Sequence, residues 1–200
     1  MPEHEHGTSL AVWDLSSPVV IGRRATLKVG LSCTSGCNLS GTPVDVYNDA
    51  GERVGTGTLG SAPWPATAAL YWVEIEIAPT EADGDQSWRI DATTLEPTHS
   101  SATSVVRAVV CKPPEHRVTL ELVDSNSQLP LGGVELRLSS FRAATDEAGI
   151  AHIEVPSGSY ELGTWKLGYK MVSKPVHIAN DTTIHLELTR EPEPEQPYWM

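Results

Sequence analysis

Apolar and polar residues alternate with a period of two along many short segments of the chain. In the segment 25–33, the odd-numbered positions from Leu27 to Cys33 are apolar, whereas Lys28 and Ser32 fall on the opposite face. This alternation predicts a β-strand with one face in a core and the other in water. The same criterion predicts strands at 43–47, 70–77, 87–93, 104–110, 117–124, 133–138, 150–155, 160–165, 176–178 and 183–188.

Turn-forming residues separate these segments. The chain has 16 Gly and 15 Pro, and the clusters at 48–51 and 81–84 combine Asp and Gly in the way that tight turns require. No stretch shows the apolar spacing of an amphipathic helix. The pattern therefore predicts an all-β fold in which antiparallel hairpins pack as sandwiches.

A domain boundary is expected where Cys111 and Lys112 are followed by Pro113 and Pro114, because adjacent prolines cannot donate the hydrogen bonds of a strand ladder. We predict two tandem antiparallel β-sandwich domains. The predicted parts are a flexible N-terminus at 1–7, a first sandwich at 8–112, a second sandwich at 113–190 and an extended, acidic, proline-rich tail at 191–200.

The second half contains four motifs in succession, at Thr145–Gly149, Ile150–Val155, Pro156–Leu162 and Lys166–Lys170. Over about 114–190 these motifs resemble the carboxypeptidase regulatory-like domains, which are transthyretin-like sandwiches akin to collagen-adhesin B-type repeats. The resemblance implies an accessory, adhesive or spacer role, because that family has no common catalytic residues. It also implies a seven-stranded sandwich in which Gly168 lets Tyr169 pack over one edge.

The first half resembles a bacterial immunoglobulin-like domain. The resemblance rests on Ala78-Pro79 leading to Gly84 and then to the strand that carries Trp88. It implies a sandwich fold and no particular function, since one fold hosts many functions.

The charge of the chain excludes two classes of partner. With 14 Lys and Arg against 26 Asp and Glu, the net charge is −12, which repels both nucleic acid and anionic membrane surfaces. The first seven residues lack the basic start and apolar core of a secretory signal. A cytoplasmic location is therefore expected, with export as the alternative if a native signal peptide has been removed.

The usual catalytic motifs are not found in the sequence. It has no Gly-x-Ser-x-Gly elbow, no P-loop and no His-Glu-x-x-His. Paired acids such as Glu74 and Glu76 lie on one solvent-facing strand face, where carboxylates are ordinary. We expect a protein that is not an enzyme.

Cysteine spacing raises the question of a metal site. Cys33 and Cys37 flank a short turn, and Cys111 and His116 flank the domain boundary. These four residues carry ligand types that zinc takes tetrahedrally. The alternatives are a local Cys33–Cys37 disulfide or reduced thiols, and the fold itself requires no cofactor.

A second metal hypothesis concerns the N-terminus. If Met1 is removed, the chain begins Pro2-Glu3-His4, and a terminal amine, two amides and His4 can wrap Cu(II) in a square plane. His6 could add an axial ligand to such a copper ion.

Aromatic side chains are the candidate partner contacts. Trp72 is in phase with Glu74 and Glu76 and should lie on the outer or edge face, and Trp64 lies in a loop. Exposed tryptophans serve as carbohydrate platforms or protein hot spots. The tail ends in a possible anchor for a partner groove, Tyr198, Trp199 and Met200. Three further tryptophans are expected in the core: Trp13, Trp88 and Trp165.

The resulting hypothesis is a non-enzymatic accessory or scaffolding protein that binds another protein through its loops, sheet edges or tail. One alternative is a metal-binding accessory that holds zinc or copper. The other is a carbohydrate-binding or adhesive module, which would require export.

Overall fold

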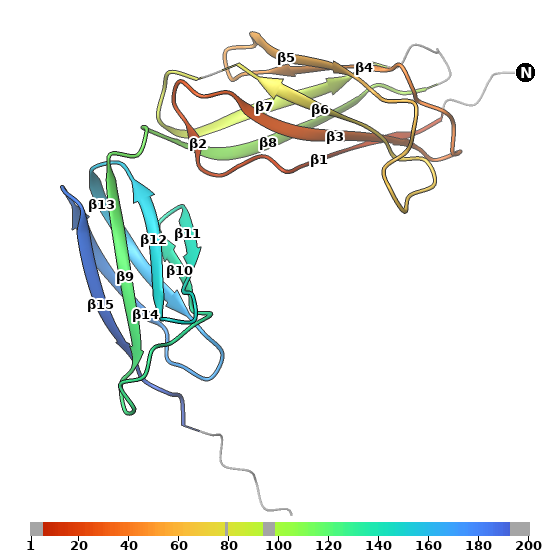
Figure 1. The fold of residues 1–200 in the computed structure, drawn as a ribbon. Coiled ribbons are helices and arrows are strands. Elements are labelled where there is room, and N and C mark those ends of the chain that lie inside the picture. The colour runs from red at the N-terminus through yellow and green to blue at the C-terminus, as the bar shows by residue number, and fades with distance from the viewer. Residues whose placement is uncertain (1–5, 79, 94–98, 193–200) are drawn as a thin grey trace, which may run out of the picture. The chain divides into compact units, whose positions relative to one another are not determined.

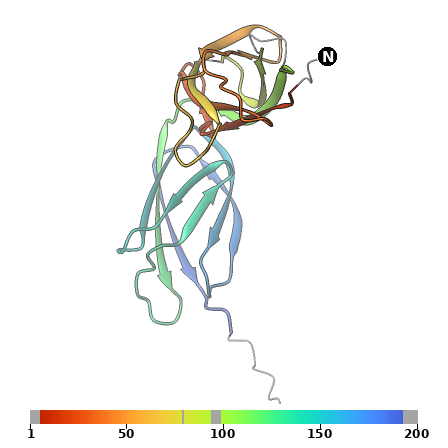
Figure 2. The same cartoon turned by 90° about the vertical axis from the view of Figure 1, so that its right-hand side faces the viewer.

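A computed structural model describes residues 6–78, 80–93 and 99–192. The chain divides into two compact units, Met1–Lys112 and Pro113–Met200. In the described part of both units the regular elements are β-strands, and each unit packs two sheets face to face (Figures 1 and 2). The predicted all-β fold of tandem sandwiches is confirmed.

The first unit pairs a three-stranded sheet, in the order β1-β3-β6, with a five-stranded sheet, in the order β2-β8-β7-β4-β5. Leu27, Val29 and Leu31 of β3 are fully buried between the sheets, as their alternation predicts. Trp88 is also buried, as expected. The strands are β1 (Thr8–Trp13), β2 (Val19–Val20), β3 (Ala25–Cys33), β4 (Pro43–Tyr47), β5 (Arg53–Thr58), β6 (Tyr71–Ile77), β7 (Gly84–Ala92) and β8 (Ala102–Cys111).

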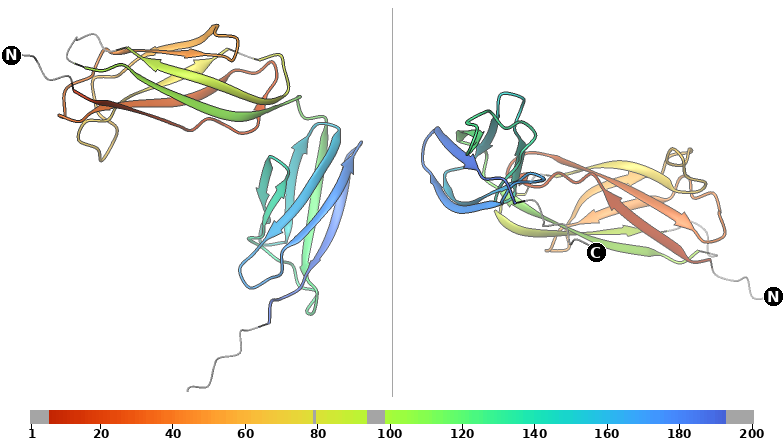
Figure 3. Two further views of the ribbon diagram at one scale, coloured as in Figure 1. Left: turned by 180° about the vertical axis from the view of Figure 1, so that it is seen from behind. Right: turned by 90° about the horizontal axis from the view of Figure 1, so that it is seen from below.

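The second unit pairs a four-stranded sheet, in the order β11-β10-β13-β14, with a three-stranded sheet, in the order β12-β9-β15. Its core lies between them and includes Leu120, Leu138 and Leu162. Figure 3 shows β13 and β14 side by side along this unit. The strands are β9 (His116–Asp124), β10 (Glu135–Leu138), β11 (Phe141–Ala144), β12 (Ile150–Val155), β13 (Gly158–Trp165), β14 (Val172–Ile178) and β15 (Thr182–Leu188).

The expectation of purely antiparallel sheets is wrong for two strand pairs. β15 runs parallel to β9, and β2 runs parallel to β8. After β14, the turn at 179–181 carries the chain from one sheet into the other. Because β15 then joins β9 without a hairpin between them, nothing imposes an antiparallel direction on the pair.

Strand β5 was not predicted from the sequence. Its core-facing positions include Gly55 and Gly57, which give no apolar signal. A Cβ on Gly55 would lie 3.0 Å from the side chain of Ile75, and one on Gly57 would lie 2.9 Å from it. The large Ile75 on β6 thus fills the volume that a β5 side chain would otherwise occupy.

Candidate functional site

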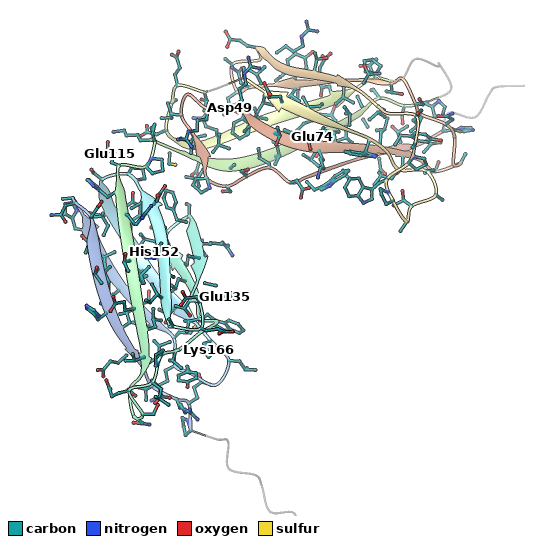
Figure 4. All side chains as sticks on the ribbon, viewed as in Figure 1. Asp49, Glu74, Glu115, Glu135, His152 and Lys166 are labelled. Atoms are coloured by element: carbon teal, nitrogen blue, oxygen red, sulfur yellow. The ribbon has the colours of Figure 1, made fainter. Side chains whose placement is uncertain are left out.

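A cleft of about 690 Å³ lies on the outer face of the sheet β11-β10-β13-β14. Its lining includes Glu135 and Arg137 of β10, Arg142 of β11, Trp165 of β13 and Met171. Figure 4 shows Glu135 on this sheet in the second unit. The volume lies within the range of about 300–1,000 Å³ that small-molecule sites occupy.

Gly163 forms part of the cleft lining. In register it lies opposite Arg137 on one neighbouring strand and opposite Ser173 on the other. Because glycine has no side chain, the sheet is open between these two residues. A flat ligand could therefore approach the backbone of β13 closely.

Two arginines of the cleft face one another across neighbouring strands. Arg137 and Arg142 are direct cross-strand partners, an arrangement that is destabilising for like charges. Arg137 donates a hydrogen bond from Nε to the carbonyl oxygen of Ser139, 2.7 Å away. Among the described residues, neither guanidinium has a carboxylate within ion-pair distance. The charged side chains of the cleft lining are thus two arginines and one carboxylate, Glu135, on a chain of net charge −12.

Trp165 was predicted to lie in the core, and that prediction is wrong. Its side chain is 51% exposed, and Met171 beside the same cleft is 73% exposed. The buried residues of β13 are Leu162 and Thr164, so the period of two directs Trp165 outward. The tryptophan presents an apolar wall to the cleft instead of filling the sandwich.

A separate cluster of four side chains lies in the first unit. One donor atom from each of His6, Cys33, Cys37 and His99 falls within 4.8 Å of the others. His6 precedes β1 and forms an isolated β-bridge with His99, although the sequence placed it in a flexible terminus. Cys33 ends β3, and Gly36, with φ of 70°, turns the chain back so that Cys37 faces it.

Hydrogen bonds organise the sulfur atoms of this cluster. The Nδ1 of His6 lies 3.2 Å from the Sγ of Cys37, and the backbone N–H of Ser35 donates to the Sγ of Cys33 at 3.3 Å. Burial raises the pKa of Cys33, but hydrogen bonds from the backbone and side chains of Cys37 and Ser35 outweigh it. The net effect is a pKa for the Cys33 thiol below its ordinary value.

The four-ligand zinc site that the sequence analysis gave as one alternative needs correction. The structure brings Cys33 and Cys37 together but not Cys111. Strand β8 runs from Ala102 to Cys111, and at ~3.3 Å per residue its two ends are about 30 Å apart. Ala102 lies just after His99, at the Cys33 end of the sandwich, so Cys111 lies at the other end. There burial raises the pKa of the Cys111 thiol.

The remaining metal predictions stand as follows. Cys33 and Cys37 are present as thiols, and their disulfide stays a prediction for the oxidised protein. His4 lies outside the described residues. The sequence analysis missed His99, which is distant in sequence from both cysteines and comes near them through its β-bridge with His6.

His116 takes part in a different arrangement in the second unit. Its Nε2 lies 3.0 Å from the Oγ of Ser157, and its Nδ1 lies 3.8 Å from Asp181. The order resembles a Ser-His-Asp triad, but the Ser157 hydroxyl and backbone N–H both donate to Glu115. The serine proton is thus held by the Glu115 carboxylate. In a catalytic triad the histidine would have to accept that proton.

The predicted aromatic contacts are half-buried. Trp64 packs edge-on against Trp13 and Trp72, at ring separations of 5.1 and 4.8 Å. The rings gather over Gly30, where a Cβ would come within 3.0 Å of both Trp13 and Leu70. Much of the aromatic surface is therefore used within the unit. The other predicted partner contacts, Tyr198, Trp199 and Met200, lie outside the described residues.

No family model matches this chain, and no curated protein matches it. Among solved structures, it is similar to the major pilin subunit BcpA of Bacillus cereus at 12% identity and a TM-score of 0.33, covering 94% of this chain and 71% of the pilin. It is similar to a CARDB domain from Pyrococcus furiosus at 16% identity and a TM-score of 0.37, covering 54% of this chain and 96% of that domain. An ice-binding, Ca²⁺-stabilised adhesin from an Antarctic bacterium matches at 10% identity and a TM-score of 0.36, covering 91% of this chain and 49% of the adhesin.

This chain spans 41% of the length of another similar structure, the Bacillus anthracis TIE protein, at 12% identity and a TM-score of 0.31 over 92% of this chain. All of these TM-scores lie below 0.5, so the function is inferred from the chain's own side chains. Within the described part of the chain, no helix has the length and apolar character needed to cross a membrane.

Proposed function

We propose that this chain is a non-enzymatic adhesive module whose second unit binds an acidic saccharide in the cleft on the sheet β11-β10-β13-β14. The observation that carries the proposal is the exposed Trp165 beside Arg137 and Arg142, which have no carboxylate partner among the described residues, in a cleft of about 690 Å³. A guanidinium binds a carboxylate through two parallel hydrogen bonds. A tryptophan ring offers the flat apolar surface against which a sugar ring packs.

Charge favours an anionic saccharide over a neutral one. A carboxylate between Arg137 and Arg142 would relieve the repulsion of two like charges directly across a strand pair. The open position at Gly163 lets a sugar ring lie against the sheet while its edge contacts Trp165. Such a ligand uses all three features at once, which a neutral apolar ligand does not.

This function would operate outside the cytoplasm. The sequence analysis gave export as the alternative to a cytoplasmic location, and binding of acidic polysaccharides favours that alternative. Protein binding through loops, sheet edges or the tail, the leading hypothesis from the sequence, stays a prediction, and the tail residues Tyr198, Trp199 and Met200 lie outside the described residues.

Calorimetric titration with an oligosaccharide of uronic acids, beside the neutral oligosaccharide with the same linkage, tests the proposal. We expect saturable binding of the acidic sugar that weakens as salt rises, because the contact is partly ionic. Trp165→Ala and Arg142→Ser should each weaken binding at least about 10-fold, which corresponds to ~1.4 kcal/mol.

Leu167→Ala is the matched control, because Leu167 is 85% exposed and lies just after Trp165 without lining the cleft. This variant should bind as the unaltered protein does. Equal affinity for the acidic and neutral sugars, or full binding by both cleft variants, would contradict the proposal.

A further inference from the structure

Four donor side chains from distant parts of the first unit meet at one end of its sandwich. His6 lies before β1, Cys33 ends β3, Cys37 follows the turn after it, and His99 lies before β8. β1 and β3 belong to one sheet and β8 to the other. The cluster therefore lies where the two sheets of the unit come together.

The distances within the cluster fit a single small ion. A tetrahedral zinc ion holds sulfur at about 2.3 Å and nitrogen at about 2.0–2.1 Å, which separates the donors from one another by roughly 3.3–3.8 Å. Here the donor atoms lie within 4.8 Å of one another, and His6 Nδ1 lies 3.2 Å from Cys37 Sγ. Small side-chain rotations would bring all four atoms to bonding distance.

The surroundings of Cys33 suit a sulfur that carries negative charge. Its Sγ accepts the backbone N–H of Ser35 at 3.3 Å and also that of Cys37. Hydrogen bonds of this kind orient a metal-bound thiolate and stabilise its charge. Cys33 and His99 are 7% and 8% exposed, so these two donors are shielded from water that would otherwise compete with them.

We infer that His6, Cys33, Cys37 and His99 bind one tetrahedral transition-metal ion, with zinc as the ion they fit best. Two sulfur and two nitrogen donors select zinc over calcium or magnesium, which prefer oxygen. Four protein donors complete a tetrahedral shell, so the site is structural and leaves no open position for catalysis.

The ion would cross-link the sandwich. It would bind His6, just before β1, and His99, just before β8, as well as Cys33 at the end of β3. The ion would thereby join the two sheets of the unit at this end of the sandwich. A ligand that binds only the folded state stabilises it by mass action. The inference rests on the first unit alone and is independent of the saccharide cleft in the second.

The test uses the full chain, purified without a histidine tag and carrying His4→Ala so that the N-terminus does not contribute metal binding. We expect one zinc ion per chain by elemental analysis and native mass spectrometry. X-ray absorption at the zinc edge should show two sulfur and two nitrogen donors. Replacement of zinc by Co²⁺ should give the intense visible bands and the thiolate charge-transfer band of a tetrahedral site.

Matched variants locate the site. Cys37→Ser and His6→Ala replace half-buried residues and should each weaken Zn²⁺ binding more than about 100-fold, since loss of a ligand exceeds the ~10–100-fold effect of an outer-shell change. Cys111→Ser, at the other end of β8, should leave the affinity unchanged. Circular dichroism reports whether each variant retains its strands.

Three results would overturn the inference. The first is a protein that binds no stoichiometric Zn²⁺ or Co²⁺ when its thiols are reduced. The second is a donor shell without two sulfur atoms. The third is metal binding that survives Cys37→Ser and is lost on Cys111→Ser, which would place the ion elsewhere.

Discussion

The Tyr169 hydroxyl donates a hydrogen bond to the Oδ2 of Asp124 across 2.9 Å, and the same oxygen accepts the Nε of Arg190 at 2.9 Å. The Asp124 side chain is only 3% exposed. Tyr169 reaches it because Gly168 adopts a φ of 80°, a conformation that glycine tolerates without strain. The buried carboxylate thus ties the end of β9 to the segments before β14 and after β15.

This contact predicts acid sensitivity in the second unit. The backbone N–H of Ser127, then Arg190 and Tyr169, hold the pKa of Asp124 well below its ordinary value. A depressed folded-state pKa contributes stability above the unfolded pKa of about 3.9, and the contribution is lost as the pH falls below that value. The protection factors of the β9 and β15 amides, which compare each exchange rate with the intrinsic rate at the same pH, should therefore fall below about pH 4.

Two variants check that assignment. Asp124→Asn should lower these protection factors at neutral pH and remove most of their further fall in acid, because the titrating group is gone. Tyr169→Phe should show a smaller effect of the same kind, since the Arg190 and backbone bonds remain. An unchanged acid profile in Asp124→Asn would show that another group controls the response.

A pair of glycines separates backbone strain from crowding. Gly149 has a φ of 75°, and a Cβ added there would lie 2.5 Å from the carbonyl oxygen of Leu122. Gly168 has a φ of 80°, and a Cβ added there would have no other heavy atom within 4 Å. Gly168→Ala should cost about 1–2 kcal/mol, which is the left-handed penalty alone. Gly149→Ala should cost a further ~1–3 kcal/mol for crowding, measured by urea unfolding. Equal costs would contradict the close approach of Gly149 to β9.

Oxidation of the metal-free protein should join Cys33 to Cys37. The turn through Gly36 brings the two cysteines together, and Cys37 already hydrogen-bonds the sulfur of Cys33. The closed loop is so short that reduction should cost only about 1–2 kcal/mol. Peptide mapping after oxidation checks the pairing, and a disulfide from Cys111 to either cysteine would contradict it.

Alternation predicted most of the strands whose inward residues are large and apolar, but not β1, where Leu10 and Val12 pack against the core. The bounds expected for β3, 25–33, are those of the structure, because Leu27, Val29 and Leu31 all face the core. β5 was missed because Gly55 and Gly57 occupy its inward positions, where Ile75 from β6 supplies the volume. The sequence of β5 alone does not show that Ile75 of β6 fills the space over its glycines.

The candidate sites were less predictable, because long-range pairing assembles them. Cys33 and Cys37 were identifiable from their spacing, but His99 joins them through its β-bridge with His6, which spacing along the chain does not show. The cleft depends on Arg142 lying opposite Arg137 on β10. Trp165 could have been assigned outward, since Leu162 and Thr164 set the inward phase of its strand.

The measurement that tests the proposed function most directly is a nuclear magnetic resonance titration of the full chain with a uronic-acid oligosaccharide. The account predicts saturable shifts at the Gly163 amide, the Trp165 indole N–H and the Arg142 side chain, all of which belong to the cleft lining. Resonances of Trp64 and Trp72 in the first unit should stay unchanged. Shifts confined to those tryptophans, or no saturable shift at Gly163 and Trp165, would contradict the account.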